Sequence, residues 1–391
     1  MKKHVVFYTA PEMDFSPATL SAVPIVIRGQ ALAAQRDGWD VAVACAKSAN
    51  PLFQDIRTIP VDFSPAPVGG TALFFRRVER KLLQYRRVLH RRWVAESAAA
   101  LAEVCPAGGT VVAPAEPEFG AALAACLPDR MFILVFHDCK FACKPRFRGK
   151  IVAPNIRLCA VSGFCARGAE RYFSLQSGSV HTSYNAVDHE LFSPQPRHVQ
   201  ERNIPLISYH GRSVPEKGID ILLEAAIRLA EAGLKFRLQL AGANRGLNLD
   251  LQDPFQKGLT AMLEQLSGLG VEVRRFGNVD FARLPEYIRS ADIHVSPARW
   301  DEPFGMATLE AMACGLATVA SNTGGTPELV GDAGLLFERE SVEQLAAQLN
   351  RLILDEPFRR EMSGRAREQS LKFTWEHSWR TLRSALGENA L

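Results

Sequence analysis

The stretch that decides the fold is residues 300–310, Trp-Asp-Glu-Pro-Phe-Gly-Met-Ala-Thr-Leu-Glu. A polar loop runs here into a helix, because Pro303 suits a first helical turn and alanine, leucine and methionine side chains follow it. The backbone N–H groups around Phe304, Gly305 and Met306 then lack partners within the helix, and Gly305 lets a ligand approach the backbone closely. Such a helix end binds anions, so we expect a phosphate-bearing ligand at this junction.

Two carboxylates flank the predicted helix start. Glu302 precedes it, and Glu310 follows eight residues later, just over two helical turns along. Two acceptors with that separation are placed to bind hydroxyl groups at opposite ends of a long ligand. A nucleotide sugar has this shape.

The whole chain has the size and composition of a two-domain globular protein. It has 391 residues, of which 47% are hydrophobic and 23% charged, and it contains no apolar run long enough to cross a bilayer. The basic start, residues 1–4, is followed by an apolar run that Pro11, Glu12 and Asp14 interrupt, which argues against a secretory signal. We therefore expect a cytoplasmic protein.

The eight cysteines are irregularly spaced, which is typical of free thiols in a reducing compartment. Cys139, Cys143, Cys159 and Cys165 lie closer together than the others, but their spacing does not match a zinc ribbon or finger. We expect small buried residues here, with a metal site as the alternative.

Residues 74–93 form a strongly basic segment. They contain eight cations and one anion, Glu79, a local charge of +7 in a chain of net charge +4. Apolar residues recur at helical spacing from Val78 to Trp93, so the segment reads as an amphipathic basic helix. This pattern suits an anionic membrane surface. The alternatives are a core-packing helix with a solvated cationic face and a helix that binds an acidic substrate.

Predicted strands and helices alternate along both halves of the chain, which indicates two doubly wound parallel sheets covered on both faces. A turn-rich stretch at 192–198 is the best linker candidate, and ligands in such folds bind beyond the carboxyl ends of the strands. Strands are predicted at residues 4–9, 40–45, 110–113, 131–136 and 158–161, then at 206–209, 236–241, 271–276, 292–296 and 317–320. Helices are predicted at 19–36, 219–232, 255–269, 282–290, 306–314, 341–354, 356–372 and 375–386.

The loop after the strand at 206–209 carries two cations, Arg212 and Lys217. Fixed cations at that position neutralise a diphosphate, Arg212 through its fork of donors and Lys217 as a point charge. Ordinary loop charge is the alternative for this loop taken alone.

Taken with residues 302–310, this loop resembles the retaining glycosyltransferases of family 4, which have the GT-B fold of two facing Rossmann-like domains with a cleft between them. The resemblance covers most of residues 150–390, and its motifs occur in the family's order. They are Ala160-Val161-Ser162, residues 184–188 with Phe192-Ser193-Pro194, Gly211-Arg212, Pro215-Glu216-Lys217-Gly218, Leu240-Ala241-Gly242, residues 276–279, Pro297-Ala298, residues 302–305, residues 310–315 and residues 324–328.

The resemblance implies a domain division and a set of site residues. An acceptor-binding domain is expected over residues 1–195, with the final helix at 373–391 packing back on it, and a donor-binding domain over residues 203–372. The donor diphosphate is expected to contact Arg212, Lys217, Gly305, Thr308 and Leu309, and the donor sugar to contact Glu302, Phe304 and Gly305. Glu310 is expected to hold the ribose, and Asn278 and Val279 the nucleobase.

His137 follows the predicted strand at 131–136, and the resemblance places a histidine in this position against the sugar or the acceptor. We expect His137 and Glu302 to be the catalytic residues, with a structural histidine as the alternative for His137. The loop after the first strand, residues 11–19, lacks the glycine pair that family members commonly have there. This departure leaves the first domain's part of the donor site, and the acceptor, undefined.

The expected function is a hexosyltransferase of the retaining type, which moves a sugar from a nucleoside-diphosphate sugar to a hydroxyl of a glycan or glycolipid. Cations and N–H dipoles take the place of a metal, so no metal and no cofactor are expected. The basic segment at 74–93 places the acceptor among lipid-linked saccharides or lipopolysaccharide at the inner face of the plasma membrane. No nucleic-acid partner is expected. The alternatives are a nucleotide-sugar epimerase of the same architecture and a non-catalytic subunit that binds a nucleotide sugar.

Overall fold

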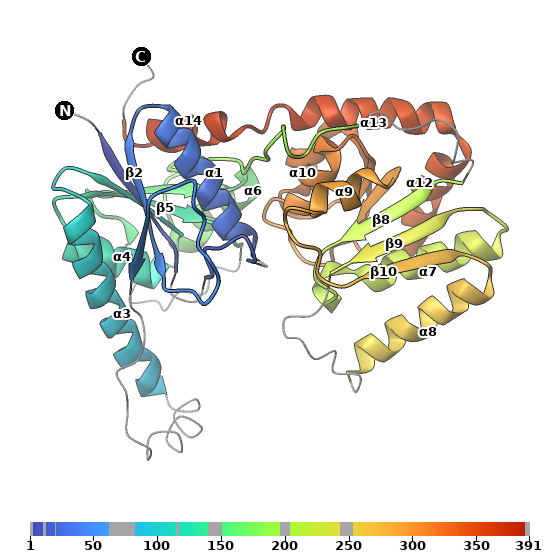
Figure 1. The fold of residues 1–391 in the computed structure, drawn as a ribbon, viewed down its shortest axis with the longest axis horizontal. Coiled ribbons are helices and arrows are strands. Elements are labelled where there is room, and N and C mark those ends of the chain that lie inside the picture. Colours follow the sequence, from blue (N-terminus) through green and yellow to red (C-terminus); the bar gives the residue numbers. More distant parts are fainter. Residues whose placement is uncertain are drawn as a thin grey trace. The chain divides into compact units, whose positions relative to one another are not determined.

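The computed structural model describes residues 3–10, 13–19, 21–61, 83–114, 117–139, 151–195, 204–242 and 253–387, with the backbone alone for 83–92 and 117–118. The chain divides into two compact units (Figure 1). Unit 1 comprises residues 1–161, 165–183 and 375–391, and unit 2 comprises residues 162–164 and 184–374. The chain thus passes into unit 2 after Ser183 and returns to unit 1 at Trp375.

Unit 1 contains a seven-stranded parallel sheet in the order β3-β2-β1-β4-β5-β6-β7. The central strands are continuous apolar runs, as expected for a sheet covered on both faces, and Val5 to Tyr8 are at most 1% exposed. The strands are β1 (His4–Tyr8), β2 (Asp40–Ala46), β3 (Thr58–Val61), β4 (Thr110–Pro114), β5 (Met131–Phe136), β6 (Ile156–Ala160) and β7 (Val180–Thr182). The helices described in this unit are α1 (Ala22–Arg36), α3 (Leu83–Val104), α4 (Pro117–Cys126), α6 (Gly163–Phe173, beginning in unit 2) and α14 (Trp375–Ser384).

The last helix, α14, packs against α1 in unit 1. Trp379 is 2% exposed, and its indole N–H donates to Asp37 at 2.9 Å. Gln30 of α1 donates to the Ser378 hydroxyl at 3.0 Å, and both side chains are buried. Burial of a large aromatic side chain together with a satisfied polar pair holds a short helix that has little intrinsic stability of its own.

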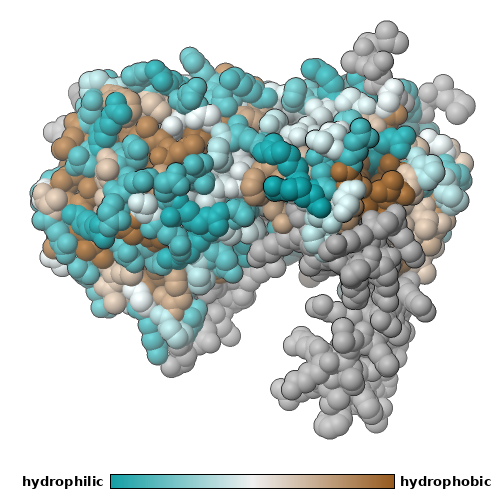
Figure 2. Space-filling model, turned by 180° about the vertical axis from the view of Figure 1, so that it is seen from behind, coloured by the Kyte–Doolittle hydropathy of each residue, from teal (hydrophilic) through white to brown (hydrophobic). Residues whose placement is uncertain are grey.

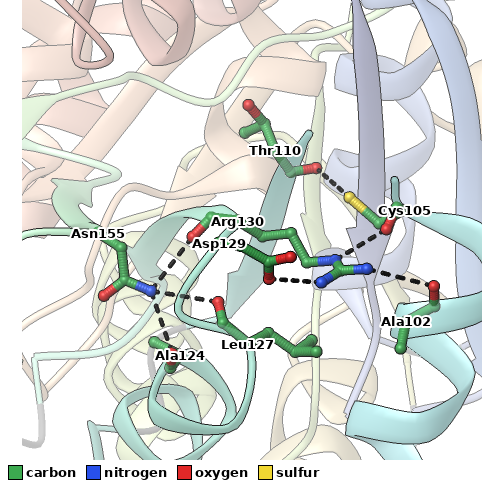
Figure 3. A network of polar contacts seen from close by, with 8 residues as sticks. All are labelled: Ala102, Cys105, Thr110, Ala124, Leu127, Asp129, Arg130 and Asn155. Atoms are coloured by element: carbon green, nitrogen blue, oxygen red, sulfur yellow. Dashed lines mark hydrogen bonds and ion pairs between the residues drawn. The ribbon is translucent and has the colours of Figure 1, made fainter. Parts of the chain in front are cut away.

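Polar side chains at the amino ends of the unit 1 strands are used to fix loops. The Arg130 guanidinium donates to the carbonyls of Cys105 and Ala102 and pairs with Asp129 at 2.5 Å. Figure 3 shows the Asn155 side-chain amide directed at three carbonyl groups, those of Ala124, Leu127 and Arg130. Because these groups are satisfied within the protein, this edge of the sheet is structural, and the chemistry is expected at the opposite edge.

Unit 2 repeats the arrangement with a six-stranded parallel sheet in the order β10-β9-β8-β11-β12-β13. Its strands are β8 (Leu206–His210), β9 (Arg237–Ala241), β10 (Glu272–Phe276), β11 (Ile293–Ser296), β12 (Ala317–Ser321) and β13 (Leu335–Phe337). Its helices are α7 (Ile219–Glu231), α8 (Pro254–Gly268), α9 (Leu284–Arg289), α10 (Met306–Ala313), α11 (Thr326–Val330), α12 (Val342–Leu354) and α13 (Glu356–Ser370), with 3₁₀ turns η2 (Pro215–Lys217) and η3 (Gly331–Ala333).

The two faces of the unit 2 sheet differ in character. Ile207 and Tyr209 of β8 pack with leucine and isoleucine side chains of α7, α8 and α12 in an apolar core. The alternate residues Ser208 and His210 point to the other face, and Tyr287 of α9 and Glu310 of α10 contact them there. Sheet alternation therefore separates an apolar core from a buried polar layer beneath α9 and α10.

The strand order places the candidate site. In both sheets the order reverses at the middle, between β1 and β4 in unit 1 and between β8 and β11 in unit 2. Ligands of doubly wound sheets bind beyond the carboxyl ends of the strands at such a reversal. In unit 2 these ends lead into the loop at 211–218 and the loop at 297–305, which carry the predicted donor-site residues.

The face seen in Figure 2 has hydrophilic and hydrophobic residues interspersed over the described parts of both units. Among the described helices, none combines the length and the apolar character that a membrane span requires.

Candidate functional site

The loop after β8 brings Lys217 close to the loop after β11. Lys217 ends the 3₁₀ turn η2, and Gly218 follows it with φ of +67°. A Cβ atom at Gly218 would lie 1.9 Å from the Pro297 carbonyl oxygen, so the close approach of the two loops requires glycine at this position. The predicted Pro-Glu-Lys-Gly motif therefore has a packing role as well as a chemical one.

Arg299 joins these two loops. Its guanidinium makes a bidentate pair with Asp220, both N–O distances being 2.6 Å, and it also donates to Glu340 at 2.9 Å and to the Pro215 carbonyl at 3.1 Å. The hydrogen bonds with Asp220 raise the pKa of Arg299. The Arg299 backbone N–H donates to the Glu216 carbonyl at 2.9 Å. Arg299 was not among the predicted site residues, although it lies two residues after Pro297 of a quoted motif.

Lys217, Glu302 and Trp300 form the centre of the site. The Lys217 Nζ atom lies 2.5 Å from Glu302 Oε2, and the Trp300 indole N–H donates to the same oxygen at 2.9 Å. Nζ also lies 4.9 Å from the centre of the Trp300 ring, within the range of a cation–π contact. The exposed fractions of the Lys217 and Glu302 side chains are 22% and 13%, so the pair is shielded and still reachable. Trp300 was missed because its role depends on this geometry.

Arg212, the other predicted cation, has an exposed side chain. The Tyr209 hydroxyl donates to the Arg212 carbonyl at 2.8 Å and so holds the backbone of this loop. Burial raises the pKa of Tyr209, which keeps this hydroxyl protonated. The guanidinium is thus carried on a fixed backbone at the same loop as Lys217.

Helix α10 begins at Met306, as predicted for the helix at 306–314, but Pro303 lies before its first turn. The expectation that Pro303 occupies that turn is wrong, because Gly305 adopts φ of +102° as the N-cap and the chain enters the helix only after it. Gly305 offers no side-chain cap, so the first amides of the helix keep their capacity to bind an anion. Phe304, just before, is 2% exposed and packs its ring near Tyr184 and Phe373.

Thr308 and Leu309 differ in what they offer a ligand. Thr308 is 1% exposed, and its hydroxyl has no hydrogen-bond partner in the described structure. A buried hydroxyl without a partner is costly, and a ligand oxygen at the helix end would satisfy it. Leu309 is fully buried, and its N–H already donates to the Gly305 carbonyl within the helix.

Glu310 is 8% exposed, and the ring of His210 lies against it, with Nε2 3.2 Å from Oε2. Asn278, after β10, is exposed, and Val279 is half-buried. Phe276, at the end of β10, is 42% exposed and lies 5.1 Å from the Tyr287 ring. An apolar and partly exposed strip thus follows this strand, as a stacking surface for a nucleobase requires.

His137 lies at the end of β5 in unit 1, where the sequence predicted it, and is half-buried. Burial lowers the pKa of His137 to about 4, so the imidazole is neutral at physiological pH. In the loop after β1, the Thr9 hydroxyl is buried without a partner in the described structure. Thr9 is 0% exposed and lies ahead of residues 11–19, the stretch that lacks a glycine pair.

Cys139 and Cys165 form a disulfide, with Cα atoms 5.4 Å apart. The prediction that all the cysteines are free thiols is wrong for this pair. The strand pairing of β5 with β6, followed by α6, brings together two residues that are 26 apart in the sequence. Cys159 is a buried free thiol, and Cys143 lies outside the described residues. Within the described ranges, no group of three or more potential metal ligands is present.

The basic segment 74–93 falls largely outside the described residues. Residues 62–82 are not described, and for residues 83–92 the backbone alone shows that they belong to α3. The predicted linker at 192–198 begins at Phe192, which is 1% exposed and packs its ring 5.8 Å from that of Phe281 in unit 2. Its last residues, 196–198, are outside the described part.

Comparison with known proteins gives matches for most of the second half of the chain. The family model described as "Glycosyl transferases group 1" matches residues 194–369. A D-inositol 3-phosphate glycosyltransferase of Stackebrandtia nassauensis is 30% identical over 214 residues, which are 52% of this chain and 47% of that protein. A GDP-mannose-dependent monoacylated alpha-(1-6)-phosphatidylinositol monomannoside mannosyltransferase of Corynebacterium glutamicum is 31% identical over 182 residues, 45% of this chain and 44% of that protein. The chain spans about half the length of these curated relatives.

Solved structures share the fold over the whole chain. The Anabaena protein HepE, in a structure with UDP and glucose, has a TM-score of 0.70 at 18% identity, covering 98% of this chain and 99% of that one. At this level of identity the likeness concerns the fold alone. With the two parallel sheets of units 1 and 2, it confirms the predicted GT-B fold class.

Proposed function

We propose that this chain, whose residues 194–369 match the model of the group 1 glycosyl transferases, moves a sugar from a nucleoside-diphosphate sugar to an acceptor hydroxyl. The observation that carries the proposal is the shielded Lys217–Glu302 pair beside the uncapped start of α10. A cation, a carboxylate and a set of free amides meet there, at the reversal point of the unit 2 sheet. A nucleotide sugar needs these three groups, for its diphosphate and for its hydroxyls.

The diphosphate is assigned to Lys217, Arg212 and the amide end at Gly305, with the Thr308 hydroxyl as a further donor. Cleavage of the sugar–phosphate bond leaves negative charge on the departing diphosphate. Fixed cations and N–H dipoles stabilise that charge as it develops, without reorganising at the moment of reaction. We therefore propose that the reaction needs no divalent metal, and that EDTA leaves turnover unchanged.

Glu302 is assigned to the donor sugar, with the backbone around Phe304 and Gly305. Its Oε2 atom is held by Lys217 and Trp300, and Oε1 is assigned to a sugar hydroxyl. Glu302 then orients the sugar and stabilises positive charge at the reacting carbon, and it is not assigned as a nucleophile. We propose retention of configuration by a same-face attack assisted by the leaving phosphate, with His137 contacting the sugar or the acceptor. The anomeric configuration of the product, measured by NMR, tests this assignment.

Glu310 is assigned to the ribose, and Asn278 and Val279 to the nucleobase. The buried Glu310 carboxylate suits hydroxyl recognition, because ribose hydroxyls are donors and the site is largely shielded from water. The base and the sugar of the donor are identified by thermal-shift screening of UDP, GDP, ADP and their sugars.

The acceptor is assigned to phosphorylated or lipid-linked hydroxyl compounds. The names of the two curated relatives support this class, since one acts on an inositol phosphate and the other on a phosphatidylinositol mannoside. The basic composition of residues 74–93 supports a membrane-bound acceptor of lipopolysaccharide or lipid-linked saccharide type, reached from the cytoplasmic face. Sedimentation with anionic vesicles at low salt tests the membrane part. Replacement of Arg86, Arg87, Arg91 and Arg92 by Glu should leave the protein in the supernatant, and wild-type protein that stays there contradicts the proposal.

The transfer itself is tested with labelled donor and a lipid extract as acceptor. Label is expected to enter the extract with the wild type, and Glu302→Gln should lower turnover by about a hundredfold, the order seen when one preorganised stabilising group is lost. The diphosphate affinity of Glu302→Gln should stay within about twofold, because the cations and amides remain. Donor turnover without any acceptor would instead favour an epimerase, and donor binding with no turnover a binding subunit.

A further inference from the structure

A buried histidine lies directly against the predicted ribose carboxylate. His210 is the last residue of β8 and is 8% exposed, and its Nε2 atom lies 3.2 Å from Glu310 Oε2. Among the described residues, this ring is the one hydrogen-bond partner of the Glu310 carboxylate. The other oxygen, Oε1, accepts no hydrogen bond from a described residue. A carboxylate buried to this extent needs a donor to keep its place and its charge.

The second ring nitrogen of His210 makes no hydrogen bond to a described residue. This nitrogen, Nδ1, is buried, so within the described residues the ring's one hydrogen bond is to Glu310. A hydrogen on Nδ1 would be a buried donor without an acceptor, and the geometry therefore assigns the ring hydrogen to Nε2. Tyr287, which packs edge-on with the ring centres 6.3 Å apart, donates its hydroxyl to the Tyr209 carbonyl instead.

His294 of β11 completes the layer around this ring. It is 1% exposed, its ring centre lies 4.9 Å from that of His210, and both of its nitrogens lack partners in the described structure. Burial lowers the pKa of His294, so this ring is neutral and supplies no charge to Glu310. In the described part of the chain, the titratable groups that face His210 are therefore Glu310, His294 and Tyr287, and Glu310 is the one it binds.

We propose that His210 is a positioning residue for nucleoside recognition, which fixes Oε2 of Glu310 so that Oε1 is presented to the ribose hydroxyls of the donor. The inference rests on the proposed function, because it takes Glu310 as the ribose carboxylate. It adds a residue that neither the motifs nor the comparisons assign. Loss of His210 should therefore weaken the contacts of Glu310 with the ribose hydroxyls and leave the diphosphate contacts unchanged.

The test compares ribose with deoxyribose. Calorimetry with UDP, GDP and ADP and with their 2′-deoxy forms measures how strongly each protein discriminates between the two sugars. His210→Asn should lose most of that discrimination, because the shorter asparagine amide cannot reach Glu310. The ribonucleotide should weaken about tenfold, and the 2′-deoxy form, which offers Glu310 the 3′-hydroxyl alone, should weaken by less. His210→Gln places an N–H donor at the same number of bonds as Nε2, and it should retain the discrimination.

A matched double variant separates positioning from general damage. In the Glu310→Gln background, His210→Asn should cause no further loss of discrimination. The inference is overturned if His210→Asn keeps the wild-type ratio of ribo to deoxy affinity, if both forms weaken equally, or if the wild type binds the two forms equally. If the wild type binds none of the three nucleoside diphosphates, the proposed function itself fails, and the inference with it.

Discussion

Replacement of Lys217 by Met isolates the role of its charge. The methionine keeps an unbranched aliphatic chain and removes the ammonium group. The Nζ atom of that group lies 4.9 Å from the centre of the Trp300 ring and 2.5 Å from Glu302. The fold should be preserved, because the Lys217 side chain is 22% exposed and η2 is held by the Arg299 contacts. We expect the nucleoside diphosphate to bind more weakly.

The magnitude follows from the lost contact. A hydrogen bond to a charged group contributes about 1.5–3 kcal/mol, which corresponds to a loss of affinity of about 10- to 150-fold. The upper part of that range is expected, since Glu302, with a side chain only 13% exposed, would then face the diphosphate with its charge no longer balanced by Lys217. In the Glu302→Gln background the same substitution should cost less, because the uncompensated carboxylate is gone.

The assay is isothermal titration calorimetry with the nucleoside diphosphate that gives the largest thermal shift. Lys235→Met is the matched control, since Lys235 is an exposed lysine of the same unit that precedes β9 at its amino end. The control should bind as the wild type does. An affinity of Lys217→Met within twofold of the wild type would remove Lys217 from the diphosphate site and refute the assignment.

Three further predictions concern the framework of the site and unit 1. Arg299→Ala should lower the diphosphate affinity and the melting temperature together, because it removes a partly exposed bidentate pair that contributes about 1–3 kcal/mol to stability. Asp220→Asn should cause a smaller loss of stability. A melting temperature of Arg299→Ala equal to that of the wild type would contradict this reasoning. Partial burial lowers the pKa of His137 to about 4, so between pH 6.5 and 4 the unfolded chain binds a proton that the folded chain does not, and stability falls as the pH drops through that window. His137→Gln should show a shallower fall in a series of urea unfolding experiments, and equal slopes would argue against a neutral ring in the folded protein. Iodoacetamide at pH 8 should label Cys126 first among the described free cysteines, because it is exposed, and peptide mass spectrometry identifies the labelled site. Burial raises the pKa of the Cys45, Cys105 and Cys159 thiols to about 12, 11 and 12 respectively. Early labelling of any of these three would contradict the structure.

The central strands and most helices of unit 2 were predicted to within two residues from the sequence. Strand β11 was expected at 292–296 and occurs at Ile293–Ser296, and α7 was expected at 219–232 and occurs at Ile219–Glu231. Buried parallel strands are continuous apolar runs, and amphipathic helices repeat every three to four residues, so both leave a local pattern. The outer strands β3, β7 and β13 have three or four residues each and left no such pattern. These short strands form because each pairs with a longer neighbouring strand.

The site was predicted as a set of residues and not as a set of contacts. The separation of Glu302 and Glu310 was expected from helix geometry, but Glu310 alone lies in α10 and Glu302 lies in the loop before it. The loop position of Lys217 follows from the end of a strand. The contact between Lys217 and Glu302 joins residues 85 apart, and the contact between His210 and Glu310 joins residues 100 apart. Neither Trp300 nor His210 carries a local signal of its role.

The sequence by itself determined which chemical groups this protein has and where each stands on its own element, because propensity, periodicity and the special backbone of glycine and proline act over a few residues. The tertiary structure alone decided which groups meet. The order β9-β8-β11 brings the ends of β8 and β11 together, and burial then strengthens a contact between residues that are distant in the sequence. The contacts of lysine with glutamate and of histidine with glutamate are consequences of that order, which no short stretch of the chain contains. The Cys139–Cys165 disulfide follows in the same way from the pairing of β5 with β6 in unit 1.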